Sequence, residues 1–273
     1  MIKSILGLLF IAASTFSFGQ DNPSSTWAKN KVVVDGKPTE WNLPLKNYDN
    51  ETGLFFDFEN DSTNLYLCFQ TKNEMNEEKI MKAGMKIILS SKINGKHKSI
   101  IDYPLPLSKS PVATGEVQPD PLAPHEDRHA AFLKKDTLME VKGFTNKNGI
   151  ISSNDVSSIH AAINWDSSRV FTYELAIPLS ELFGSGYDLK DLSKGIAMDV
   201  IINAVHGGNM QNRGGGGYPG RGGGRMGGGG RMGGGYGGGN RMAEQEGSGQ
   251  YQGGNPFMYQ KTELKQKFIL ATE

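Results

Sequence analysis

The sequence predicts an all-β protein, an antiparallel β-sandwich of about ten strands with a long disordered glycine-rich insertion before the last strand. Apolar and polar residues alternate with a period of two along most of the chain, as strands with one buried face require. Gly, Asn and Asp turn residues separate these short runs, and few segments have a helical period. Many short strands with frequent turns and few helices are typical of two packed antiparallel sheets.

The first 19 residues predict a cleaved secretory signal peptide. A lysine precedes the apolar run 5–13, which is too short to span a bilayer, and small residues stand at Ser17 and Gly19. Cleavage is therefore expected before Gln20, and no lipid-anchoring cysteine follows the run. Because no later stretch is long and apolar enough to be a membrane span, the mature protein is expected to be secreted or periplasmic. A buried N-terminal helix is the alternative for residues 1–19.

Ten segments carry the strand signal, and they are expected at 31–34, 54–58, 65–69, 85–89, 98–101, 138–141, 160–165, 170–177, 196–205 and 265–271. Helices are expected only at 76–83 and, after Pro178, at 179–183. Residues 105–136 are rich in proline and are expected to be irregular.

Residues 207–254 form the glycine-rich insertion, in which 24 of 48 residues are Gly and Leu, Ile, Val and Phe are absent. Such a composition cannot bury enough apolar surface to offset the entropy of ordering, so disorder is expected. Since strand patterns flank the insertion, residues 20–273 are interpreted as one domain with a loop between two strands.

The insertion admits three interpretations. Nucleic-acid binding is disfavoured because the chain has no net charge and is expected to be exported. Thioethers could hold a soft ion such as Cu(I), and the candidate ligands are Met226, Met232 and Met242. The favoured interpretation is a spacer or adhesive loop that contacts a protein partner through tyrosines, namely Tyr218, Tyr236 and Tyr251.

Several short motifs are similar to those of one group of β-sandwiches. They are Val34-Asp35-Gly36 with Glu40-Trp41, Asn60-Asp61 with Asn64-Leu65-Tyr66-Leu67, the segment 173–179 and the closing Phe268-Ile269-Leu270-Ala271. This pattern resembles the family 9 carbohydrate-binding modules and the related DOMON-like domains. The resemblance implies a non-catalytic module that binds a saccharide between aromatic side chains, and it implies that a calcium ion can be bound.

Trp165 is the candidate platform for a sugar, because an indole packs well against the apolar face of a pyranose. It ends a predicted strand beside a polar turn, whereas Trp41 lies in a segment interpreted as structural. The alternative for Trp165 is an ordinary core or edge tryptophan. The candidate calcium ligands are Asn60, Asp61 and Asn64, and the alternative there is a turn stabilised by its own backbone contacts.

Other chemistry finds little support in the sequence. His125 and His129 are four residues apart, as two metal ligands on a helix would be, but their surroundings favour a solvated loop. The single Cys68 excludes an intramolecular disulfide and is expected to be a buried thiol. No nucleophile elbow, phosphate loop or dinucleotide motif is present, so a non-enzyme is expected. A structural or surface-interaction protein that displays the insertion is the alternative to saccharide binding.

Overall fold

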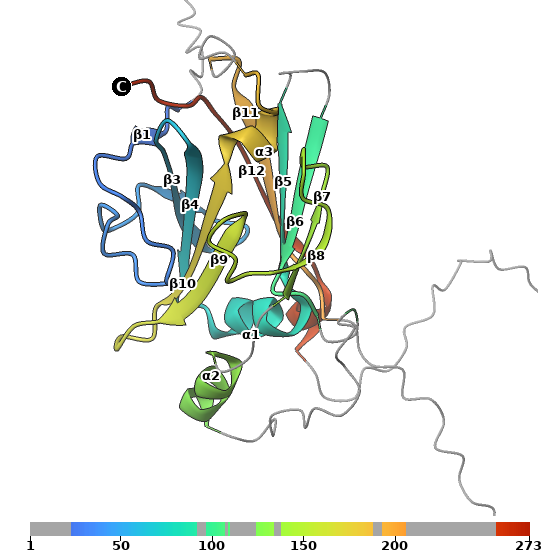
Figure 1. The fold of residues 1–273 in the computed structure, drawn as a ribbon. Helices are drawn as coiled ribbons and strands as arrows, with labels where there is room; N and C mark the ends of the chain where they lie inside the picture. Colours follow the sequence, from blue (N-terminus) through green and yellow to red (C-terminus); the bar gives the residue numbers. More distant parts are fainter. Residues whose placement is uncertain are drawn as a thin grey trace, which may run out of the picture.

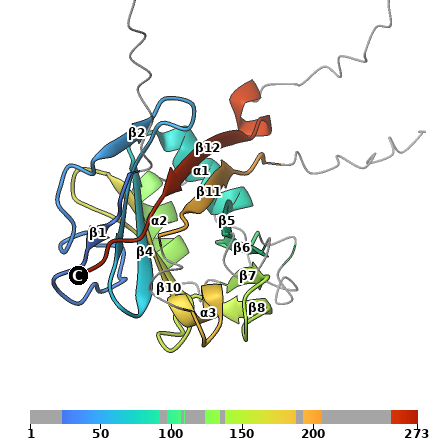
Figure 2. The same cartoon turned by 90° about the horizontal axis from the view of Figure 1, so that it is seen from above.

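The computed structural model describes residues 23–91, 97–106, 109, 124–133, 138–187, 193–205 and 255–273, and these form two six-stranded β-sheets. Figure 1 shows the sheets side by side, and Figure 2 shows the same arrangement from above. The predicted all-β sandwich is therefore confirmed. Apart from the pair β1–β3, every pair of strands within the sheets is antiparallel.

The first sheet has the order β1-β3-β4-β10-β9, with β2 paired to β3. Its strands are β1 (Thr26–Trp27), β2 (Asn47–Asp49), β3 (Leu54–Asn60), β4 (Asn64–Thr71), β9 (His160–Trp165) and β10 (Phe171–Pro178). In the second sheet the order is β12-β11-β5-β6-β7-β8. Its strands are β5 (Met85–Ser91), β6 (His97–Tyr103), β7 (Leu138–Lys142), β8 (Gly149–Ser152), β11 (Ile196–Ile202) and β12 (Thr262–Phe268).

The helices lie outside the two sheets. They are α1 (Glu74–Ala83), α2 (His125–Leu133), α3 (Leu179–Phe183) and a 3₁₀ turn, η2 (Pro256–Tyr259). In Figure 1, α1 runs across one end of the sandwich and α2 lies beyond it at the same end. No helix in the described part of the chain is long and apolar enough to cross a membrane.

One apolar core fills the space between the sheets. The inward-facing residues of each strand alternate with outward-facing ones, so both sheets contribute to a single buried cluster. Phe58 of β3 and Phe268 of β12 meet across this core, with ring centroids 4.3 Å apart and planes 23° from parallel. Through this ring contact, the last strand of the second sheet packs against the first sheet.

The predicted strand at 31–34 is wrong. These residues have no regular structure; Val32 is buried whereas Val33 is 49% exposed. They belong to residues 28–45, a covering segment that packs on the outer face of the first sheet. The first strand, β1, lies upstream of it. Packing against a preformed sheet face has overridden the β-propensity of three consecutive valines.

The loop interpretation of 125–129 is also wrong, because these residues belong to α2. The short strands β1, β2 and β8 carry no recognisable alternation and were missed by the sequence prediction. The remaining nine predicted strands and both predicted helices are confirmed; the strand 160–165 and the helix 179–183 have the predicted bounds, and the ends of the others are shifted.

The covering segment is joined to the first sheet through the buried carboxylate of Glu174 on β10. This carboxylate accepts hydrogen bonds from Trp41 Nε1 at 2.9 Å, Gly36 N at 2.8 Å and Asp35 N at 3.1 Å. Gly36 has a φ of 77°, and a Cβ there would lie 2.5 Å from the Cβ of Asn164 on β9. The turn therefore requires glycine and holds the segment against the strand that ends at Trp165.

The buried Glu174 carboxyl predicts a pH-dependent stability. Burial raises its pKa to about 7 from 4.5, although the bonds from Gly36, Asp35 and Trp41 act in the opposite direction. The folded state thus keeps this proton to a higher pH than the unfolded state. Its stabilising effect should be complete below pH 4.5 and lost as the pH rises through 7, a change of about 3 kcal/mol.

Urea unfolding of the wild type and of Glu174→Gln at several pH values measures this change, because glutamine does not titrate. We expect the wild type to lose stability relative to the variant between pH 4.5 and 7.5. A difference that stays constant across this range contradicts the assignment of the raised pKa to Glu174.

The two strands that flank the insertion lie in one sheet, where they are antiparallel neighbours. β11 and β12 pair from Ile196↔Phe268 to Ile202↔Thr262, and beyond them Val205 N donates to Met258 O at 2.8 Å. The chain therefore leaves and returns at one place on the sheet. The insertion 207–254, its Met and Tyr candidates and the predicted signal peptide 1–19 lie outside the described residues.

This pairing predicts that the insertion can be removed without loss of the fold. If residues 206–254 form a flexible loop, replacing them by a short turn reduces the entropy of loop closure and should stabilise the domain by about 2 kcal/mol. Thermal and urea unfolding of the shortened chain measure the effect. A destabilised or unfolded product would show that the insertion contributes contacts to the sandwich.

Candidate functional site

The β9–β10 hairpin positions the candidate site at the end of the first sheet where α1 lies. Its turn is held by Asp166, whose Oδ1 accepts from Ser168 N and from Val170 N, both at 2.8 Å. Arg169 has a φ of 61°, in the left-handed region, and its N–H donates to Asp166 O at 3.0 Å. This tight turn fixes the positions of Ser168 and Arg169, three and four residues after Trp165.

Trp165 is half-buried and is surrounded by aromatic rings. The His129 imidazole of α2 stacks on one face of the indole, with centroids 3.9 Å apart and planes 11° from parallel. Phe171 and Phe132 meet the indole edge-on, at 5.3 Å and 6.0 Å. The predicted platform therefore has one face covered by a neighbouring side chain of the same chain.

Glu77 of α1 links the indole to the imidazole. Its Oε2 accepts a hydrogen bond from Trp165 Nε1 at 3.1 Å and lies 3.6 Å from His129 Nε2, which makes an ion pair when the imidazole is protonated. Glu77 is only 3% exposed. The Asn73 side chain caps the start of α1 by accepting from Met75 N and Asn76 N, and this cap fixes the first turn that carries Glu77.

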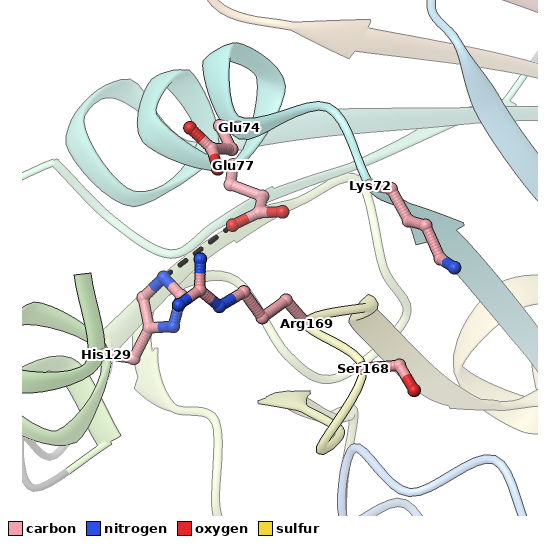
Figure 3. A pocket seen from close by; sticks show the side chains of 6 residues that line it. All are labelled: Lys72, Glu74, Glu77, His129, Ser168 and Arg169. Carbon is pink, nitrogen blue, oxygen red and sulfur yellow. Dashed lines mark ion pairs between the residues drawn. The ribbon is translucent and has the colours of Figure 1, made fainter.

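A hollow of about 220 Å³ lies beside this cluster. Its lining comes from three parts of the chain, and Figure 3 shows the residues: Lys72, Glu74, Glu77, His129, Ser168 and Arg169. Five of these side chains carry or can carry a charge, and Ser168 offers a hydroxyl. The hollow therefore presents both hydrogen-bond donors and acceptors next to the stacked rings.

Asn60, Asp61 and Asn64 lie at the opposite end of β4 and form a closed turn. Asp61 Oδ1 accepts from Thr63 N at 2.6 Å and from Asn64 N at 2.7 Å, and Asp61 Oδ2 accepts from Tyr66 Oη at 2.8 Å. Burial alone would raise the pKa of the Asp61 carboxyl, but these bonds outweigh burial and hold that pKa below its ordinary value.

The Asn60 side chain is directed to other partners. Its Oδ1 accepts from the Ser25 hydroxyl and from Ala271 N, and its Nδ2 donates to Ala271 O at 3.1 Å. The oxygens of Asn60 and Asp61 thus bind separate protein groups and are not gathered around one point. The turn fits its own backbone better than a cation, and calcium binding here stays a prediction.

No group of three or more His, Cys, Asp or Glu side chains able to hold a metal ion occurs among the described residues. The His125 side chain is outside that description, whereas His129 contacts Trp165 and Glu77. Cys68 is a buried free thiol, as predicted, and burial raises its pKa well above the ordinary value.

Sequence reasoning missed most of the residues that line the hollow. Glu74 and Glu77 start a helix that the periodicity placed two residues late, and only Asn73, a typical capping residue, could have corrected this. Arg169 follows a strand in a turn of ordinary composition, so no sequence signal marks it. Their proximity to His129 depends on the packing of α2, because His129 lies 52 residues after Glu77 and 40 residues before Arg169 in the chain.

The geometry defines a sandwich-like all-β protein with a polar hollow beside a stacked tryptophan. No protein-family model matches this chain, and no curated protein matches it by sequence. Among solved structures, it is similar to a family 9 carbohydrate-binding module from Caldicellulosiruptor kristjanssonii in complex with glucose. The sequence identity is 12%, the match covers 67% of this chain and 77% of the module, and the TM-score is 0.31. The resemblance is weak and concerns the fold alone.

Proposed function

We propose that this protein is an exported, non-catalytic module that binds a saccharide at the hollow beside Trp165. The observation that carries the proposal is the combination of a stacked aromatic platform with a lining of charged and hydroxyl side chains. A pyranose has an apolar C–H face and a rim of hydroxyls, so it needs both kinds of surface at once.

The lining residues would divide the recognition of the sugar between them. Glu74 can accept hydrogen bonds from hydroxyls, whereas Lys72 and Arg169 can only donate. Hydrogen bonds to charged groups contribute about 1.5–3 kcal/mol each when buried, so two or three of them can fix the orientation of one ring. The indole of Trp165 supplies the apolar contact.

A screen of the mature chain on an immobilised glycan panel tests the proposal. We expect retention of at least one glycan, and we expect Trp165→Ala to weaken it by about 30-fold, because a buried aromatic anchor contributes about 2 kcal/mol. Arg169→Ala should weaken it by about tenfold. The matched control is Trp27→Ala, since Trp27 is also half-buried but lies on β1, away from the hollow. Equal loss in both tryptophan variants, or no retention at all, contradicts the proposal.

A second candidate function is the display of the glycine-rich insertion to a protein partner. The observation in its favour is that the chain leaves and re-enters the second sheet at Val205 and Met258, which are hydrogen-bonded to each other. A deletion of 206–254 separates the two functions: it should leave glycan retention intact if the sandwich binds the ligand, and it should abolish partner binding if the insertion does.

A further inference from the structure

The geometry points to α2 as a built-in competitor for the saccharide. His129 of α2 occupies the face of Trp165 on which a sugar ring would stack. The inference rests on the proposed function, and it concerns how access to that site is regulated. It has three supports: the position of His129, the nature of the contacts that hold α2, and the hollow beneath the end of α2.

The His129 imidazole takes the place that a pyranose would occupy. Its ring is nearly parallel to the indole, at 11° with 3.9 Å between centroids, which is the face-to-face arrangement of a stacked ligand. The other aromatic neighbours, Phe171 and Phe132, approach edge-on at 68° and 89° and leave the stacking face to His129. A sugar and His129 therefore cannot occupy this face together.

Ion pairs and aromatic contacts hold the middle and end of α2 against the rest of the fold. Besides the His129–Glu77 pair, Arg128 Nη1 lies 4.0 Å from Glu78 Oε1. Phe132 adds the edge contact to Trp165. The Arg128–Glu78 pair is partly exposed and contributes little to stability, whereas the His129–Glu77 pair is more buried. A nine-residue helix has little stability of its own.

Phe132 packs against the main apolar core, whereas Leu133 lies over a second hollow at the end of α2. This hollow has a volume of about 310 Å³, and Phe132 and Leu133 line it together with Asp35 and His160. Leu133 remains 48% exposed. Elements with few buried apolar contacts open locally at low cost, so α2 can move away from Trp165 while the two sheets stay folded.

Competition of this kind makes the apparent affinity for the saccharide equal to the intrinsic affinity multiplied by the fraction of molecules in which α2 has moved away. The smaller that fraction is, the weaker the observed binding. Loosening α2 without replacing any side chain that lines the hollow beside Trp165 should therefore tighten binding. Phe132→Ala does this, because Phe132 contacts the indole edge but does not line that hollow. Leu133→Ala is the matched control, since Leu133 is its neighbour on α2 and makes no ring contact with Trp165.

The experiment has two readouts on the full mature chain. The first is the protection of the α2 amides from hydrogen exchange without sugar, which reports how readily α2 opens. The second is the midpoint of retention on a panel of methyl pyranosides and of cello-, malto- and xylo-oligosaccharides. We expect Phe132→Ala to lower this protection and to tighten retention by about fivefold or more, the lower end of typical coupling between linked equilibria. Leu133→Ala should change neither readout.

Arg128→Ala is a second route to loosening, in case Phe132→Ala fails to fold. It should lower the protection of α2 and tighten retention by a smaller factor of about twofold, because a partly exposed ion pair contributes little to stability. If either folded variant lowers the protection of α2 but retains the panel with unchanged or weaker midpoints, the competition is refuted while saccharide binding stands. Unchanged protection in both variants equally refutes it, because α2 would then not be held by these contacts. If no variant retains any glycan, the proposed function fails and the inference fails with it.

Discussion

Trp41→Ala should destabilise the domain by about 3–5 kcal/mol, as large-to-small substitutions of buried aromatic residues do. Trp41 is 5% exposed, and it is the largest side chain of the second apolar cluster, which joins the covering segment to the outer face of the first sheet. Its removal leaves a cavity beside Tyr66 and Cys68 and deprives the buried Glu174 carboxylate of its indole donor.

The variant Trp41→Phe separates these two effects. It keeps most of the apolar contact but removes the N–H group that donates to Glu174 Oε1 at 2.9 Å, so a loss of about 1–3 kcal/mol is expected. Urea unfolding measures both variants. Equal losses for Ala and Phe would show that the hydrogen bond dominates, and a loss below about 1 kcal/mol for Ala would contradict the packing of the covering segment.

Phe268→Ala should cost a similar amount, about 3–5 kcal/mol, for a different reason. Phe268 is fully buried on β12, the strand that follows the insertion, and it stacks on Phe58 of the opposite sheet. Its removal takes away the aromatic contact by which β12 packs against the opposite sheet. We therefore expect both a lower free energy of unfolding and weaker protection of β12 amides from hydrogen exchange.

Lys267→Ala provides the matched control for this prediction. Lys267 precedes Phe268 on the same strand but is exposed, so its replacement should change the stability by no more than about 0.5 kcal/mol. If the two variants were equally stable, residues after the insertion would not be part of the core. The expected difference thus tests whether the insertion interrupts one sandwich.

The strand pattern could be predicted where each strand has one face in the core. The alternation in β3, β5 and β10 follows directly from burial of Phe56, Ile87 and Tyr173, for example, and each was recognised within a residue or two of its bounds. The segment 31–34 was predicted incorrectly because β-branched residues that cover a sheet have the same local composition as residues within one. Strands of two to four residues, such as β1, are determined by tertiary pairing and leave no period to read.

The candidate site was predictable only in part. Trp165 could be proposed from its type and from its place at a strand end, and Trp41 could be interpreted as structural, which the structure confirms. The partners of Trp165 could not be predicted, because Glu77 and His129 reach it from elements 88 and 36 residues away in the sequence. His129 illustrates the limit most clearly: its spacing from His125 suggests a metal pair, whereas the fold uses it as a stacking ring.

The central claim, that a saccharide binds at Trp165, is tested most directly by the indole resonances of the three tryptophans during a glycan titration. Each indole N–H gives its own ¹H–¹⁵N signal, and Trp→Phe variants assign the three signals. We expect a glycan retained by the panel to shift the Trp165 signal saturably, while those of Trp27 and of Trp41, which is buried against Glu174, stay unchanged. A Trp165 signal that does not move at a saturating glycan concentration would contradict the claim.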